Sequence, residues 1–194
     1  MLKEVFPLEM NDLKRIREYL EKNNDVVFLA IINIGVNTAL RYSDLSRLTF
    51  EEVAQNFNFI IREKKTNKIR HLYLNKICIN EIERLKRYYT EKGIEPKGFI
   101  FKSLFRPYIA HKIDRPITVQ SVNKKFKSLQ KKLDIKYNIG THSLRKTWGF
   151  IYYSNTGDIA TLMYCLNHSN ENNTLRYIGI TDKKIGDIFI NLLI

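Results

Sequence analysis

The chain has 194 residues, of which 44% are hydrophobic and 27% charged, and a formal net charge of +13 at pH 7. This composition predicts a folded protein with one sizeable core and argues against a disordered chain. Solubility alone needs a net charge of only about 2–8 in a small domain, so the excess of basic residues favours a polyanionic partner, nucleic acid before an anionic membrane surface.

The two cysteines, Cys78 and Cys165, lie far apart and show no metal-ligand spacing. The sequence therefore predicts neither a zinc site nor a disulfide framework, and it favours a reducing, cytoplasmic location. The longest apolar run, 26–36, falls short of the roughly 18 residues that a membrane span needs, and the N-terminus does not resemble a signal peptide. We expect no membrane segment, metal or cofactor.

Helical spacing of Leu13, Ile16 and Leu20 after a candidate N-cap, Asn11, predicts a first helix. Apolar periodicity and turn residues predict the elements that follow. In chain order these are helices over 25–40 and 43–48, strands over 57–63 and 69–74 joined by a polar turn, a helix ending at Gly93, and a short apolar stretch of uncertain type over 98–101.

The segment from Thr118 to Leu133 has the clearest helical pattern. Its apolar stripe consists of Val119, Val122, Phe126, Leu129 and Leu133. Its lysines are Lys124, Lys125, Lys127, Lys131 and Lys132. A lysine-rich face is usually solvated surface, but in so basic a chain a DNA-facing role is equally well supported.

From Thr141 onward the pattern predicts four more short helices. The whole chain, residues 1–194, is predicted to form one mainly helical domain with a small antiparallel sheet, an α+β fold that indicates no function by itself.

Arg41 and Asp44 are three residues apart. On a helix they share a face, so we expect Asp44 to support the Arg41 guanidinium. Lys65 lies in the predicted hairpin turn, where a lysine is usually solvated. Neither feature indicates a function by itself.

Thr141 is expected to cap a helix, which places His142 and Arg145 on one face of the first turn. Exposed N–H groups and the helix dipole favour a phosphate there, although a capped helix start with a structural histidine has the same pattern. Further along the chain are His168 and Tyr177. Tyrosine occurs 11 times, so Tyr177 is not distinguished by residue type.

The order and spacing of these residues, together with their flanking residues, resemble the signature of the tyrosine recombinase (phage integrase) family. The residues that carry it are Arg41, Lys65, His142, Arg145, His168 and Tyr177. Residues 40–45 are similar to the family's first arginine box, 142–148 to its second, and 166–170 with 174–177 to its C-terminal box. The resemblance runs from about Leu8 to the C-terminus and covers the catalytic domain only.

The chain departs from the family pattern at Ala39 and Asn167, where glycine is usual, and neither change removes a catalytic group. Lys65 is the least distinct assignment, because Lys64 and Lys68 are close to it. No N-terminal core-binding domain is expected within 1–194. Either the chain is one domain of a longer protein, or it resembles the short bacterial DNA invertases that lack that domain.

The resemblance implies an enzyme that cuts and rejoins double-stranded DNA through a 3′-phosphotyrosine at Tyr177. It implies that Arg41 and Arg145 stabilise the charge on the phosphate and that His142 and His168 donate hydrogen bonds or move protons. Lys65 would be the acid that protonates the leaving oxygen. It implies no metal or cofactor. It also implies a homo-oligomer on DNA, a tetramer in the synaptic complex, and a role in integration, excision or inversion of a mobile element.

Three alternatives remain open at this point: a non-catalytic DNA-binding protein with the same fold, a type IB topoisomerase-like enzyme, and a basic RNA-binding domain. The constellation argues against the last, and RNA-binding aromatic motifs are absent. Near the C-terminus an apolar stripe over 185–192 fits either closure of its own domain or docking on a neighbouring protomer.

Overall fold

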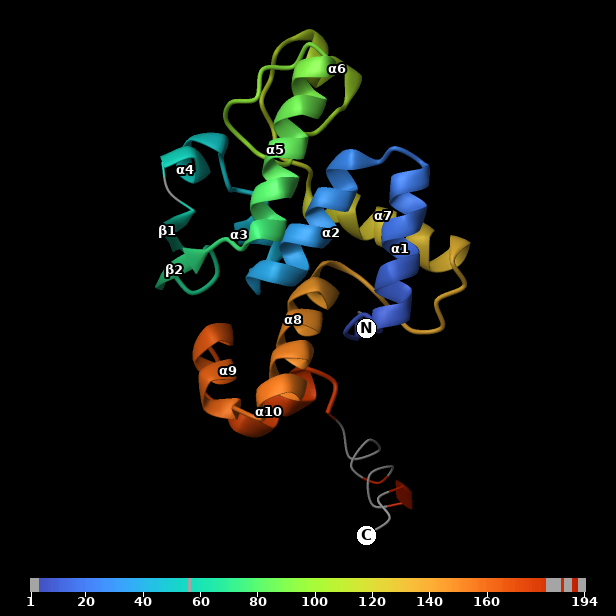
Figure 1. The fold of residues 1–194 in the computed structure, drawn as a ribbon, viewed down its shortest axis with the longest axis vertical. Coiled ribbons are helices and arrows are strands. Elements are labelled where there is room, and N and C mark those ends of the chain that lie inside the picture. Colours follow the sequence, from blue (N-terminus) through green and yellow to red (C-terminus); the bar gives the residue numbers. More distant parts are fainter. Residues whose placement is uncertain (1–3, 56, 181–185, 187–189, 192–194) are drawn as a thin grey trace.

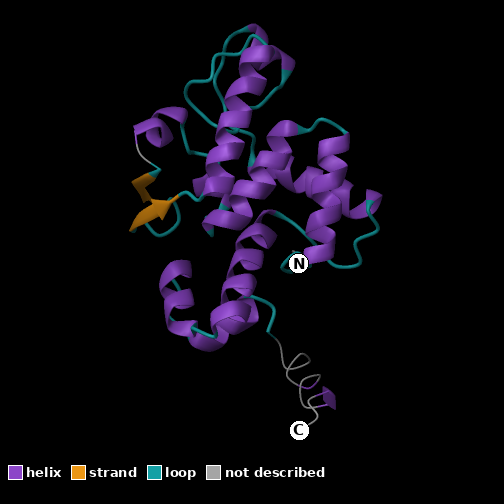
Figure 2. Cartoon of the chain, in the orientation of Figure 1, coloured by secondary structure: helices purple, strands orange, loops and turns teal. Residues whose placement is uncertain are grey.

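The structure, a computed structural model, describes residues 4–55, 57–180, 186, 190 and 191. This part of the chain is mainly helical, with one two-stranded antiparallel sheet at the side of the molecule (Figures 1 and 2). The predicted α+β class is thereby confirmed. In chain order the elements are α1 (Met10–Lys22), α2 (Val26–Thr38), α3 (Tyr42–Leu45), α4 (Phe50–Gln55), β1 (Asn58–Arg62), β2 (Ile69–Tyr73), α5 (Lys76–Glu91), α6 (Arg106–Ala110), α7 (Val119–Lys132), α8 (Thr141–Thr156), α9 (Ile159–Leu166) and α10 (Glu171–Tyr177).

Helix α2 lies at the centre because its sequence is apolar on every side, as expected of a helix surrounded by protein. It packs against α1, α5 and α8 (Figure 1). The crossing with α8 is close at Gly35, where an added Cβ would lie 2.6 Å from Leu144 Cδ1. This close approach brings the start of α8, with Arg145, against the C-terminal end of α2.

The buried apolar residues form two clusters. The larger is built mainly from α1, α2, α5 and α7. The smaller joins Ala39 to Leu162, Leu166 and Ile178 of the C-terminal helices, with Tyr177 packed at its margin. The candidate catalytic residues therefore lie near the junction of two separately packed regions.

The hairpin pairs β1 with β2 in the register Asn58↔Tyr73 to Arg62↔Ile69. Both strands agree with the predicted segments to within a residue or so at each end. Backbone hydrogen bonds close the turn, from Glu63 N to Lys68 O (3.0 Å) and from Asn67 N to Glu63 O (2.9 Å).

Several local expectations were wrong. Helix α1 starts earlier than expected, with Glu9 as its N-cap, so Asn11 lies inside the helix. Thr141 is the first residue of α8 and Gly140 is the cap. Helix α8 is long, and the short helices α4 and α6 were not predicted. The stripe over 185–192 falls outside the described residues. Among the described helices, none is long and apolar enough to cross a membrane.

Candidate active site

The residues singled out from the sequence come from separate elements. Arg41 is the N-cap of α3, Lys65 lies in the β1–β2 turn, and His142 and Arg145 lie in the first turns of α8. His168 follows α9, and Tyr177 ends α10. Local folding places each of them, but only the packing of these elements brings them near one another.

Arg145 is only 1% exposed. Its guanidinium donates hydrogen bonds to the carbonyl oxygens of Ala39, at the end of α2, and Leu166, at the end of α9. Burial lowers its pKa to about 10, so the group remains charged at neutral pH. A buried cation held by two helix C-termini is strongly oriented, because carbonyl dipoles at such ends favour positive charge.

Arg41 is held by a carboxylate that the sequence patterns did not indicate. Its Nη1 lies 2.7 Å from Glu63 Oε2, and the Glu63 side chain is 0% exposed. The expectation that Asp44 supports Arg41 was wrong: Asp44 Oδ1 instead accepts a hydrogen bond from the backbone N–H of Lys64 (2.8 Å). Asp44 therefore anchors the hairpin turn. Its Oδ2 is buried and has no hydrogen-bond partner within the described residues.

His168 lies beside the tyrosine with a defined neighbour on Nδ1, which is 3.2 Å from Thr174 Oγ1. The Thr174 hydroxyl donates its proton to the Asn170 carbonyl (2.7 Å), so its oxygen accepts from His168 and the ring proton is assigned to Nδ1. Burial and the charges of Arg145 and Arg41 lower the pKa of His168 to about 4. The neutral ring consequently presents an unprotonated Nε2.

Tyr177 is half-buried and meets His168 edge-on, with ring centroids 5.0 Å apart. Lys146 Nζ lies over the tyrosine ring, 5.1 Å from its centroid. Burial raises the pKa of the phenol, and this rise is opposed by the charges of Arg145 and Arg41 and by a hydrogen bond with Arg145. The buried Arg145 guanidinium is therefore within electrostatic reach of the Tyr177 hydroxyl.

The side chains of His142 and Lys65 are both exposed. Desolvation of its ring and the charges of Arg145, Lys146, Arg41 and Lys65 lower the pKa of His142. The Lys65 ammonium is therefore within electrostatic reach of this histidine. Neighbouring Lys68 instead donates to Asn167 Oδ1 (2.8 Å).

Both departures from the family's glycines occur at left-handed backbone positions, with φ of +53° at Ala39 and at Asn167. These residues end α2 and α9, where helices commonly terminate in a left-handed residue. Glycine suits such positions because it has no Cβ, and asparagine tolerates them better than alanine. The left-handed backbone is therefore present at Ala39 and Asn167 although neither residue is glycine.

Glu63, Thr174 and Lys146 contact the predicted residues but were not singled out from the sequence. Asn167, noted only as a departure from glycine, contacts Glu63. A weak signal existed for Glu63, the one acidic residue in the basic turn 62–65. The others could be found only from their position beside the site. Among the described residues, no group of three His, Cys, Asp or Glu side chains could hold a metal ion.

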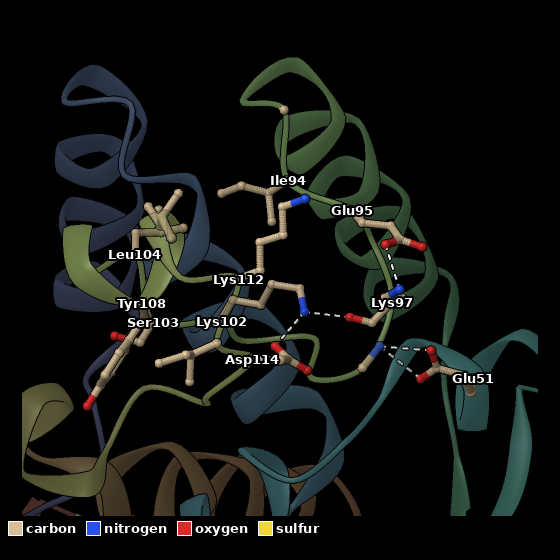
Figure 3. A pocket seen from close by; sticks show the side chains of 14 residues that line it. Glu51, Ile94, Glu95, Lys97, Lys102, Ser103, Leu104, Tyr108, Lys112 and Asp114 are labelled. Atoms are coloured by element: carbon tan, nitrogen blue, oxygen red, sulfur yellow. Dashed lines mark hydrogen bonds and ion pairs between the residues drawn. The ribbon is translucent and has the colours of Figure 1, made fainter.

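A cavity of about 730 Å³ lies away from this site, between the end of α5 and the α6 region (Figure 3). Four of its charged groups pair with one another: Lys102 Nζ with Asp114 (2.6 Å) and Lys97 Nζ with Glu95 (2.7 Å). These four groups therefore offer no unpaired charge to a ligand in the cavity.

The five lysines of α7 divide into two sets. Lys125 pairs with Asp25 (2.5 Å) and Lys132 donates to the Tyr19 hydroxyl (2.8 Å), so both are turned toward α1 and α2. The second set is Lys124, Lys127 and Lys131, whose side chains are exposed. Its spacing of i, i+3 and i+7 places these lysines on one face.

Together, the fold and the site indicate a class of protein: a tyrosine whose ring meets a histidine and whose hydroxyl feels the charges of two arginines is suited to phosphoryl transfer onto tyrosine. The phage integrase family model matches residues 7–184, and the chain belongs to that family. It is a site-specific tyrosine recombinase, an enzyme of the class that cleaves and rejoins DNA.

Two relatives illustrate the likeness. The probable integrase/recombinase YoeC of Bacillus subtilis is 33% identical over 174 residues, which is 89% of this chain and 88% of that protein. The tyrosine recombinase XerC of Caldanaerobacter subterraneus is 31% identical over 157 residues, which is 80% of this chain but 42% of that protein. The chain thus spans less than half of this XerC.

Solved structures share the fold. The XerA recombinase superposes with a TM-score of 0.72 at 19% identity, over 97% of this chain and 64% of that one. The XerH site-specific recombinase, solved with its difH substrate, superposes with a TM-score of 0.70 at 18% identity, over 95% of this chain and 52% of that one.

Proposed function

We propose that this chain cuts and rejoins double-stranded DNA with Tyr177 as the nucleophile. The observation that carries this proposal is the setting of Tyr177: its ring meets His168 edge-on with centroids 5.0 Å apart, Lys146 Nζ lies over the ring, and the charge of Arg145 reaches its hydroxyl closely enough to oppose the rise in its pKa. A phosphate bound to Arg145 would lie next to that hydroxyl. DNA is also the partner named for the Tn1549 transposon integrase, which shares the fold with a TM-score of 0.67, and the charge of +13 suits it.

In the cleavage step, the Tyr177 oxygen forms a bond to phosphorus while the bond from phosphorus to the 5′-oxygen breaks. The phenolic proton goes to a base, and the departing 5′-oxygen gains a proton. The products are a 3′-phosphotyrosine and a free 5′-hydroxyl. Rejoining reverses these steps, so the covalent intermediate conserves the bond energy.

Charge accumulates on the non-bridging oxygens in the transition state. Arg41 and Arg145 are assigned to stabilise it, because planar guanidinium groups match phosphate oxygens and are already oriented by Glu63 and by helix ends. The chain's own cations supply this charge. Cleavage is therefore expected to continue in EDTA.

Proton transfer is assigned to the remaining groups. Because the pKa of Tyr177 is raised, the phenol is protonated at neutral pH and needs a base. His168, with Nε2 unprotonated, and His142, with a lowered pKa, are the groups able to accept that proton. Lys65, exposed on the turn, is assigned to protonate the 5′-oxygen.

We further propose a homo-oligomer on DNA, a tetramer in the synaptic complex, and a cytoplasmic location where Cys78 and Cys165 stay reduced. Contact between protomers is assigned to the apolar stripe over 185–192. Truncation after Ile180 should reduce assembly on DNA in gel-shift or sedimentation experiments, and unchanged assembly would refute this role.

The test of the function is Tyr177→Phe, which removes only the hydroxyl. The variant should bind DNA as the parent does but form no covalent adduct on denaturing gels. Tyr164, 87% exposed, is the matched control, and Tyr164→Phe should keep the adduct. Formation of an adduct by Tyr177→Phe would disprove the assignment.

A further inference from the structure

The Glu63 side chain is completely buried, and both of its carboxylate oxygens have partners. Oε2 receives hydrogen bonds from Arg41 (2.7 Å) and Thr66 (2.7 Å), and Oε1 lies 3.5 Å from Arg70. Burial alone would raise its pKa, but the hydrogen bond from Thr66 and the charge of Arg41 hold it down at about 2. The carboxylate therefore remains ionised among the groups that donate to it.

These partners belong to different parts of the site. Arg41 is a proposed phosphate-binding group, and Thr66 follows Lys65 in the turn. Arg70 donates to the carbonyls of Thr38 and Ala39, the second of which also accepts from Arg145. One carboxylate thus joins the Arg41 guanidinium, the turn that carries Lys65 and the helix end that holds Arg145.

Asn167 extends this network across the site. Its Nδ2 lies 3.3 Å from Glu63 Oε2, and its Oδ1 accepts from Lys68 Nζ (2.8 Å). Glycine would fit the left-handed backbone here equally well but could make neither contact. The Asn167 side chain therefore links the segment that carries His168 to Glu63 and Lys68, which lie on the two sides of the hairpin turn.

We propose that Glu63 is a positioning residue for strand cleavage that acts through Arg41, and that Asn167 holds the Lys65 turn against the segment carrying His168. This inference rests on the proposed function of the site. The turn is anchored on either side of Lys65, by Asp44 at the Lys64 amide and by Glu63 at the Thr66 hydroxyl. The backbone is thereby fixed while the lysine side chain stays exposed.

The first experiment compares Glu63→Gln with the parent on normal DNA and on DNA carrying a methylphosphonate at the scissile position, where a neutral methyl group replaces one charged oxygen. On normal DNA, the cleavage rate should fall by about 10- to 100-fold. This loss is no larger than the loss expected when a group that stabilises transition-state charge is removed completely. On methylphosphonate the difference from the parent should shrink at least several-fold, because less charge needs stabilising.

The matched control is Glu81→Gln. Glu81 also accepts from a buried amide, Asn33 Nδ2 (2.9 Å), and the oxygen of that amide accepts from Arg17 (2.7 Å), but Glu81 lies on α5 outside the site. This variant should cleave both substrates at the parent's rates. A parental rate for Glu63→Gln, or an equal defect on both substrates, would overturn the role of Glu63.

Asn167→Gly is the second variant, for the case that Glu63→Gln fails to fold. Glycine suits the left-handed backbone at this position, so the melting temperature should be nearly unchanged. Cleavage should nevertheless fall about 3- to 10-fold, and it should recover on DNA with sulfur as the 5′-bridging atom, since that leaving group needs no acid. Parental cleavage by Asn167→Gly, or no recovery with sulfur, would refute its role. Failure of the parent itself to form an adduct would instead refute the proposed function.

Discussion

Lys65, like His142, is exposed, which suits the proposed role of a group that follows a departing oxygen. Expelling an alkoxide is difficult because its conjugate acid has a pKa near that of water, about 15.7, whereas a thiol has a pKa of about 8.5. Lys65→Ala should therefore be slowed at least about 100-fold on normal DNA and recover when sulfur replaces the 5′-bridging oxygen. Cleavage rates on the two substrates measure this.

Arg145→Ala should not recover with sulfur, because its assigned role is at the non-bridging oxygens. Lys64→Ala and Lys68→Ala are the neighbouring controls, and the ammonium of Lys68 is already bound by Asn167. Recovery of either in place of Lys65→Ala would move the acid to that lysine. If none recovers, the acid lies elsewhere and His142 is the next candidate.

His168 should make the DNA-free protein sensitive to mild acid. Its pKa is about 4 when folded, against an ordinary value of about 6.5. The unfolded chain then binds the proton first, so stability is fully present above about pH 6.5 and is lost as the pH falls toward 4. The melting temperature should drop by about 5 °C over that window.

In His168→Gln this drop should become smaller, and part should remain because the pKa of His142 shifts the same way. His111→Gln, at an exposed position outside the site, should behave as the parent does. Glu63 acts in the same direction but in a more acidic window, from about 4.5 down to about 2. An unchanged slope in His168→Gln would contradict the buried, neutral histidine.

At the scale of elements, α7 presents one free basic face. Replacing Lys124, Lys127 or Lys131 by alanine should weaken DNA binding several-fold, and each replacement of a phosphate-binding lysine should reduce the salt slope by about one. Lys125→Ala and Lys132→Ala should have smaller effects, because these lysines already bind Asp25 and Tyr19. Equal effects of all five variants in fluorescence-anisotropy titrations would contradict this division.

Elements with a local signature were predicted well. The apolar stripe of α7 can be recognised within one segment, and the first residue of the predicted segment, Thr118, is the N-cap and accepts from Ser121 N (3.1 Å). Helices α4 and α6 were missed because each is too short to show a full apolar period. The cap of α8 was misplaced by one residue, since Gly140 has no side-chain signal for this role.

For the whole molecule, a net charge of +13 should make DNA binding depend steeply on salt. With about 6–10 phosphate contacts, affinity should fall by about 10³–10⁵ between 50 and 200 mM salt, because bound cations are released from the DNA. The parent and Tyr177→Phe should show the same slope. A flat response would argue against DNA as the main partner.

The sequence by itself determined the family and the residues of the proposed chemistry, because that chemistry requires particular groups in a particular order, and it determined most helices, because their periodicity is local. Only the tertiary structure decided what holds those groups. Arg41 pairs with Glu63 across 22 residues and Asn167 reaches Glu63 across 104, both through the docking of the hairpin. Asp44 lies three residues after Arg41 in the sequence, but it accepts a hydrogen bond from the backbone amide of Lys64 in that hairpin. Such partners depend on how separately formed elements pack, which no local pattern encodes.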